Sequence, residues 1–181
     1  MEPQPQKKII SKVVIAGPAK SGKTSLLLKI LDNATPSGEY IPTAGVEFGA
    51  YTDGPNKFQI WDTSGQEGSR SSTRSYYKGI QLGIICFDCG SRDQLSTTEY
   101  YITEIKAAAV PKEPDQGPML PELLLVSNFS DRTGDREVQV KEAEDFARKH
   151  GLHYLDFSCI TGDRDVVKAK LREMLEKYQT K

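Results

Sequence analysis

A glycine-rich loop lies between an apolar run and a helical pattern near the start of the chain. Residues 17–24 read GPAKSGKT and match the pattern G-x-x-x-x-G-K-[ST]. The preceding run KVVIAG, residues 12–17, is typical of a strand, and residues 21–31 carry leucine and isoleucine at helical spacing. In such a unit the backbone N–H groups of the loop surround phosphate oxygens. The chain is therefore expected to fold around this unit, and the loop predicts a ligand that carries phosphate groups.

Two side chains of the loop carry specific chemistry. Lys23 would reach the terminal phosphates, and the Thr24 hydroxyl would bind Mg²⁺. The loop indicates a nucleotide without saying which base or which reaction. An ordinary glycine turn is the alternative, and the flanking strand and helix patterns disfavour it. The other residues expected to surround the phosphates are Ala19, Lys20, Ser21, Gly22 and Ser25. Among them, Lys20 suits a solvated charge better than a phosphate ligand.

The remaining chain alternates short apolar runs with longer helical patterns. Asp53-Gly54 is a strong hairpin signal between two of the runs. Alternation of this kind predicts an α/β fold with a six-stranded, mostly parallel sheet, one antiparallel edge strand, and helices on both faces. The further strands are expected at residues 45–52, 57–62, 82–88, 123–127 and 153–158, and the helices at 91–110, 138–150 (capped by Gly151) and 163–178.

The length of 181 residues suits one domain. We expect a disordered N-terminal segment at 1–8, the folded domain at 9–178 and a short tail at 179–181. Residues 111–122 are rich in proline and acid and are expected to form an exposed loop. No signal peptide is visible, and the first apolar run, residues 9–16, is too short to span a bilayer.

Charge and cysteine content narrow the functional classes. The net charge of −1 gives no reason to expect a nucleic-acid partner. Cys86 and Cys89 have the spacing of half a zinc or redox motif, but there is no second pair and the chain has two histidines. Buried thiols in a reducing compartment are the better interpretation, so we expect a cytoplasmic protein.

A second segment with chemical content is KFQIWDTSGQE, residues 57–67. It places an acid at the end of an apolar strand, followed by a glycine and an amide. This order would let Asp62 organise Mg²⁺, Gly65 approach a γ-phosphate and Gln66 orient a water molecule.

Together with PTAGVEF at residues 42–48, this segment resembles the Rab branch of the Ras-superfamily small GTPases. SYYKG at 75–79 and ICFD at 85–88 resemble two further signatures of that branch. The resemblance covers about residues 12–178. It implies a P-loop NTPase fold, GTP or GDP with Mg²⁺, and a switch between the two nucleotide states.

The resemblance also implies roles for individual residues. Thr43 would bind Mg²⁺ and sense the γ-phosphate, joining Thr24 and Asp62 at the metal. Gln66 and Lys23 would be the catalytic residues, by positioning water and by neutralising charge. Arg70 and Arg74 are better explained by an exposed helical face than as arginine fingers. Slow intrinsic hydrolysis is therefore expected, accelerated by an activating protein that donates an arginine.

Partners are implied in the same way. Phe48, Trp61 and Tyr76 match apolar residues that Rab proteins present to effectors, with core packing as the alternative for Phe48 and Trp61. An exchange factor is also implied. Rab proteins usually end in prenylated cysteines, and this sequence has none after Cys159. Peripheral association with the cytosolic face of intracellular membranes would need a lipidated tail beyond this chain.

The base site departs from the family pattern. Asn128-Phe129-Ser130-Asp131 stands where relatives have N-K-x-D, and Ser158-Cys159-Ile160 stands where they have S-A-K. Phe129 and Ile160 thus replace two lysines, and Pro36 lies where relatives place an aromatic residue. Asp131 can still accept hydrogen bonds from guanine, so we expect guanine specificity with faster release. The Ala19 methyl group is expected to slow hydrolysis.

Three functions are compatible with these residues. The first is an active GTP switch in vesicle trafficking. The second is a degenerate relative that binds nucleotide weakly and serves as an adaptor or structural subunit. The third, an ATP-dependent phosphotransferase, is disfavoured because Asp131 does not suit adenine.

Overall fold

A six-stranded sheet forms the centre of the protein, in the order β2-β3-β1-β4-β5-β6. The computed structural model describes residues 9–31, 43–109 and 119–181. All strand pairs are parallel except β2 with β3, which form the antiparallel hairpin at one edge. This confirms the predicted α/β fold. The strands are β1 Ile9–Ala16, β2 Val46–Asp53, β3 Asn56–Thr63, β4 Leu82–Asp88, β5 Glu122–Asn128 and β6 His153–Asp156.

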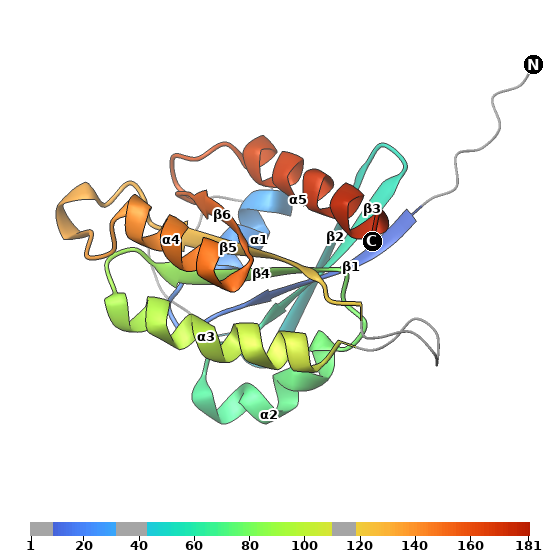
Figure 1. Cartoon of the computed structure of the whole chain (residues 1–181), viewed down its shortest axis with the longest axis horizontal. Helices are drawn as coiled ribbons and strands as arrows, with labels where there is room; N and C mark the ends of the chain where they lie inside the picture. Colours follow the sequence, from blue (N-terminus) through green and yellow to red (C-terminus); the bar gives the residue numbers. More distant parts are fainter. Residues whose placement is uncertain (1–8, 32–42, 110–118) are drawn as a thin grey trace, which may run out of the picture.

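Helices cover both faces of the sheet. One core cluster joins α1 and α5 to the sheet, and a second joins α3 and α4 to the opposite face. Figure 1 shows α5 and α1 on one side of the strands and α2 and α3 on the other. The helices are α1 Lys23–Leu31, α2 Arg70–Thr73, α3 Arg92–Ala107, α4 Val140–His150 and α5 Arg164–Gln179, with 3-10 turns η1 Glu67–Ser69, η2 Arg74–Tyr77 and η3 Thr133–Asp135.

The residues with predicted chemical roles follow the carboxyl ends of the buried strands. β5 is buried along its whole length, and β4 is buried up to Asp88, as expected of strands covered on both faces. The strands β1, β3, β4 and β5 are mutually parallel. The loops that follow Ala16, Thr63, Asp88 and Asn128 therefore meet at the carboxyl end of the sheet. This end of the sheet carries the candidate site, as in other open α/β sheets.

Several predicted boundaries differ from the structure. α3 ends at Ala107 rather than at residue 110, and β6 ends at Asp156 because residues 157–162 turn toward α5. β1 starts three residues earlier than predicted, since Ile9 pairs with Asn56, the first residue of β3 after the hairpin turn. The short helices between Glu67 and Tyr77 were not predicted as elements. Gly151 caps α4 in the left-handed conformation, as predicted.

Some expectations fall on residues that the structure does not describe. The segment 1–8, Pro36, and most of the loop 111–122 lie outside the described residues. Leu120 and Pro121 lie just before β5, and Glu122 is already its first residue. Among the described helices, none combines the length and apolar character needed to cross a membrane.

Candidate functional site

The loop between β1 and α1 encloses a buried cation. Lys23, the first residue of α1, is 6% exposed, and its Nζ donates to the carbonyl of Pro18 at 2.7 Å. Burial lowers the pKa of Lys23, an effect that the nearby Cys86 and Asp62 oppose. Gly17 has a φ of 140°, and a Cβ there would lie 2.3 Å from the carbonyl oxygen of Cys86. Glycine at this position lets the loop turn against β4 and hold Lys23 inside it.

Three oxygen-bearing side chains converge beside this loop. Thr24 Oγ1 lies 2.8 Å from Thr43 Oγ1 and donates to Asp62 Oδ2 at 2.5 Å. Asp62 is fully buried, and its Oδ1 has no hydrogen-bond partner among the described residues. Burial raises the pKa of Asp62 to about 6, against the lowering effects of Thr24 and Lys23. Hydroxyl and carboxylate oxygens are the ligands that Mg²⁺ prefers, so this group fits the expected ion.

Gly65 lies directly against the loop at residues 17–24, the expected phosphate loop. A Cβ at Gly65 would be 2.5 Å from Lys23 Nζ and 2.6 Å from the backbone nitrogen of Ala19. Ser64 N donates to the carbonyl of Gly45 at 2.9 Å, which joins this segment to the one that carries Thr43. Gln66 follows with an exposed side chain. The two segments singled out in the sequence therefore meet at the loop.

Arg70 and Arg74 are engaged with α3. Arg74 Nε lies 3.0 Å from Glu104 Oε2, and its side chain is 59% exposed, as expected of a helical surface. For Arg70 the expectation of an exposed face is wrong. Its side chain is 29% exposed, and its guanidinium carbon lies 4.4 Å from the centre of the Tyr100 ring. The aromatic surface of α3 attracts this cation by packing and by charge.

The loop after β5 is tied to the phosphate loop. Asn128 is buried; its Nδ2 donates to the carbonyl of Ser21 at 3.1 Å, and its Oδ1 accepts from Phe129 N at 2.9 Å. Phe129 has a φ of 64°, and its ring carbon Cζ lies 3.2 Å from the position a Gly22 Cβ would take. The Phe129 ring therefore lies over the glycine of the phosphate loop. Asp131 is exposed beside it.

The loop after β6 approaches the same place. Cys159 Sγ lies 3.5 Å from Asn128 Oδ1, which joins the two loops. Ser158 Oγ accepts from the backbone nitrogens of Ile160 and Thr161, at 3.1 Å each. Ile160 is 60% exposed. The structure thus places Asn128, Phe129, Ser158 and Cys159 in one cluster and leaves Ile160 at its rim.

Comparison with known proteins identifies the family. Residues 12–179 match the family model described as Ras family. The chain belongs to the Ras family. It is 34% identical over 155 residues to Ras-related protein Rab-26 of Mus musculus, covering 83% of this chain and 56% of that protein.

Two other Rab proteins give similar values. Ras-related protein Rab-2B of Dictyostelium discoideum is 33% identical over 155 residues, covering 83% of this chain and 72% of that protein. Ras-related protein Rab-37 of Homo sapiens is 32% identical over 162 residues, covering 87% of this chain and 69% of that protein. The chain is therefore a Rab-like small GTPase of the Ras superfamily, and it spans little more than half the length of the mouse relative.

This Rab-like protein also has three residues at the site that were not predicted from the sequence. Gln94 Nε2 donates to the carbonyl of Ala19 at 3.3 Å, and Cys89 Sγ donates to the carbonyl of Phe129 at 3.3 Å. Arg132 lies with its guanidinium carbon 4.0 Å from the centre of the Phe129 ring. The position of Cys89 just after a strand that ends at the site was an available signal. For Gln94 and Arg132 the sequence held none.

An aromatic pair lies on the hairpin of the Rab-like protein, with Phe48 exposed and Trp61 partly buried. Phe48 is 57% exposed, and its ring centre lies 5.0 Å from that of Trp61. Lys12 Nζ lies 5.2 Å from the centre of the Trp61 ring and donates to the carbonyl of Lys78 at 3.0 Å. Core packing is excluded for Phe48 by its exposure. Tyr76, the third aromatic expected on this surface, is partly buried on η2.

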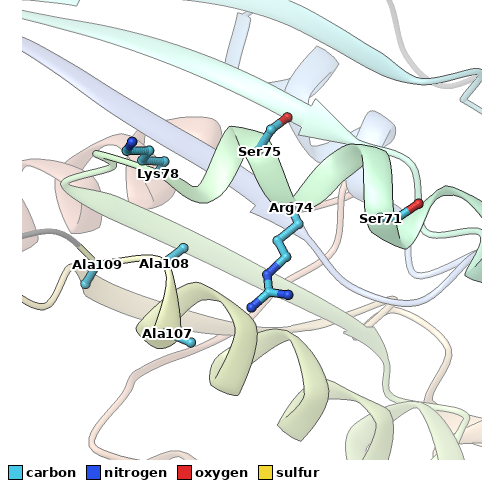
Figure 2. Close-up of a pocket in the computed structure, with 7 residues that line it drawn as sticks. All are labelled: Ser71, Arg74, Ser75, Lys78, Ala107, Ala108 and Ala109. Carbon is cyan, nitrogen blue, oxygen red and sulfur yellow. The ribbon is translucent and has the colours of Figure 1, made fainter.

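A groove of about 410 Å³ lies between η2 and the end of α3. Figure 2 shows the Arg74 side chain extending from η2 toward α3, where it pairs with Glu104. None of the residues that line the groove belongs to the candidate nucleotide site. It is lined by Ser71, Arg74, Ser75, Lys78, Ala107, Ala108 and Ala109.

Proposed function

We propose that this Rab-like protein is an active switch that binds GTP and GDP with Mg²⁺, hydrolyses GTP slowly and acts in vesicle trafficking. The observation that carries the proposal is the convergence of Thr24, Thr43 and Asp62 beside the loop that holds Lys23. A buried carboxylate with one unpartnered oxygen is costly unless a cation is nearby. A bound Mg²⁺ would supply that charge and would neutralise phosphate oxygens.

The residues of the chain would divide the chemistry among them. Lys23 would hold the terminal phosphates, Gly65 would permit close approach, and Gln66 would orient the attacking water. Arg70 and Arg74 are held against α3, so the charge-stabilising arginine would come from an activating protein. Residues 9–178 would form the switch domain.

Partner binding would use the hairpin surface. The exposed Phe48 and the partly buried Trp61 form an aromatic pair of the kind that anchors protein interfaces, and Tyr76 would complete it on η2. Effectors and an exchange factor are the proposed partners, with no nucleic acid. The protein would act in the cytoplasm, and peripheral association with the cytosolic face of intracellular membranes would require a lipidated tail.

The first experiment is the nucleotide content of the purified protein, released by denaturation and resolved by ion exchange. Near-stoichiometric GDP or GTP would support the switch. We expect guanine nucleotide, released faster than in typical relatives because Phe129 and Ile160 replace two base-covering lysines. Slow GDP release in the ordinary range of the family would contradict that expectation.

Gln66→Leu tests the catalytic proposal. The variant retains the phosphate loop but cannot orient water, so single-turnover GTP hydrolysis should fall on the order of 10- to 100-fold. GTP affinity, measured by displacement of a fluorescent analogue, should stay unchanged. If the variant and the parent protein hydrolyse GTP at the same rate, Gln66 has no catalytic role.

An adaptor with weak nucleotide binding is the second candidate. The 60% exposure of Ile160 favours it, because this residue stands where relatives cover the base with a lysine. Thr24→Asn separates the two candidates. In a switch it should disturb Mg²⁺ binding and lower GTP-dependent partner binding, whereas an adaptor would bind its partner equally well with or without the substitution.

A further inference from the structure

Phe129 is covered on one side by a cation from its own loop. The guanidinium carbon of Arg132 lies 4.0 Å from the centre of the Phe129 ring, within the range of cation–π attraction. The two residues are three apart in the turn that follows β5, and the backbone nitrogen of Arg132 donates to the carbonyl of Phe129 at 2.9 Å. The turn therefore closes on itself and brings the guanidinium onto the ring.

Asp88 forms an ion pair with this guanidinium. Arg132 Nη1 lies 3.4 Å from Asp88 Oδ2, and Gly90 N donates to Asp88 Oδ1 at 2.8 Å. Asp88 is the last residue of β4, so its carboxylate is fixed by the sheet and by the turn that follows. Cys89 adds a contact from its thiol to the carbonyl of Phe129. Phe129 is thus held through its ring by Arg132, which pairs with Asp88, and through its carbonyl by Cys89.

The direction of this support leaves the opposite side of the ring for a ligand. In the sheet β5 lies between β4 and β6. Arg132 approaches Phe129 from the β4 side, where Asp88 lies, whereas Cys159 and the rest of the loop after β6 approach Asn128 from the other side. A planar base enclosed between these two loops would meet the ring on the side away from Arg132. Its phosphates would lie at the loop that Phe129 overlies at Gly22.

We infer that Phe129 is an aromatic platform for the guanine base and that Arg132, braced by Asp88, is a positioning residue that sets how long the nucleotide stays bound. The inference rests on the proposed nucleotide-binding function. An aromatic ring that stacks on a base must be held in one orientation, since each freely rotating side chain loses entropy on binding. Arg132 and Asp88 would supply this order before the nucleotide arrives, in place of the lysine that relatives use.

The test is the dissociation rate of GDP from the full chain, measured by displacing a fluorescent GDP analogue with excess GDP. Arg132→Ala should accelerate dissociation about two- to fivefold, because a cation–π contact of this exposure is worth about 0.5–1 kcal/mol. Arg132→Lys, which retains the cation, should recover part of the loss. The matched control is Arg148→Ala, which removes an exposed arginine paired with Asp145 on α4 and should leave the rate unchanged.

A double-mutant cycle with Phe129→Leu distinguishes positioning from general structural support. Phe129→Leu alone should accelerate dissociation, and adding Arg132→Ala should then have no further effect, because Arg132 would act through the ring. IDP should show the same ratios as GDP, since stacking involves the ring face rather than the amino group at its edge. If Arg132→Ala destabilises the fold, Arg132→Lys still tests the contact between the cation and the Phe129 ring.

The outcomes separate this inference from the function on which it rests. No measurable GDP binding by the unmodified protein would overturn both. GDP binding with an unchanged rate in Arg132→Ala would overturn the role of Arg132 alone. So would equal acceleration by Arg132→Ala in the parent protein and in the Phe129→Leu variant. The switch proposal would stand in either of these cases.

Discussion

At the scale of single residues, Gly65 shows how closely the segment after β3 approaches the loop at residues 17–24. A Cβ at this position would lie 2.6 Å from both the nitrogen of Ala19 and the carbonyl carbon of Pro18. Both atoms belong to backbone, which cannot rotate away as a side chain can. The absence of a side chain at Gly65 is therefore a requirement of this packing.

Gly65→Ala is expected to destabilise the protein by about 1–3 kcal/mol, the usual cost of overpacking a tight contact. The measurement is the free energy of unfolding in urea. Gly68→Ala is the control, because a Cβ at Gly68 meets nothing within 4 Å and no left-handed φ is involved. Equal unfolding free energies for the two variants would show that the segment shifts away from the loop at little cost.

At the scale of elements, α3 begins and α4 ends at capping residues, Ser91 and Gly151, of the types that favour helix ends. Ser91 starts α3 by accepting from Gln94 N at 3.3 Å. Gly151 ends α4 with a φ of 70°, and the amide of Leu152 then returns to the carbonyl of Ala147 at 2.8 Å. This turn directs the chain from α4 into β6. The conformation favours glycine because a Cβ collides with the neighbouring carbonyl in left-handed backbone.

Gly151→Ala should cost about 1–2 kcal/mol of unfolding free energy for this reason. Beyond its own local backbone, a Cβ at Gly151 meets no atom within 4 Å, so any loss measured by thermal or urea unfolding comes from the left-handed backbone conformation. Gly134→Ala offers the comparison, since it also faces open space but has no left-handed φ. A loss as large at Gly134 as at Gly151 would refute the explanation.

The hairpin and the last helix also form a joint element. Arg172 of α5 donates from Nε to Asp53 Oδ2 at 2.7 Å, at the tip of the β2–β3 hairpin. Lys168, one turn earlier, lies 5.0 Å from the centre of the Tyr51 ring, which stacks on Phe58. These contacts fasten one face of the hairpin to α5. Phe48, on the opposite face, stays exposed.

At the scale of the whole molecule, charged groups are gathered at the end of the sheet opposite the candidate site. Glu122, the first residue of β5, lies 2.7 Å from His153 and 2.7 Å from Lys181, and 3.3 Å from Lys177. Glu173 faces His153 from α5 at 3.9 Å. Burial alone would raise the pKa of Glu122, but Lys181, His153 and Lys177 together lower it to about 2. The cluster joins β5, β6 and the end of α5.

This cluster predicts a specific pH dependence of stability. The pKa of Glu122 falls from an ordinary value of 4.5 to about 2 on folding. Its contribution is therefore fully present above about pH 4.5 and is lost as the pH falls toward 2. Glu122→Gln should cost about 1–3 kcal/mol at pH 7, since it removes hydrogen bonds to charged groups. The difference in unfolding free energy between the parent and Glu122→Gln should then shrink between pH 4.5 and 2.

Glu176→Gln, on the exposed face of α5, is the control and should leave stability nearly unchanged. A difference between the parent and Glu122→Gln that stays constant down to pH 2 would contradict the assignment to the carboxylate.

Features with a local cause could be predicted from the sequence. The phosphate loop at residues 17–24, the Asp53-Gly54 turn, the left-handed cap at Gly151 and the buried runs of β4 and β5 each follow from a few neighbouring residues. Backbone preference and burial pattern act over that range, so the order of strands and helices along the chain could be predicted. The expectation that the loops after the parallel strands lie together at the carboxyl end of the sheet rested on that order.

Which distant side chains meet depended on the tertiary packing. Arg70 lies on Tyr100, Arg132 joins Asp88 across 44 positions, and Glu122 joins His153 across 31. No local preference encodes such pairs, because a charged side chain can satisfy its charge in water as well as in many contacts. The packed sheet selects among them by bringing certain strand ends together and excluding water between them. The two loops proposed to hold the base could thus be predicted from the sequence, whereas the contacts that join Phe129, Arg132 and Asp88 emerged only from the fold.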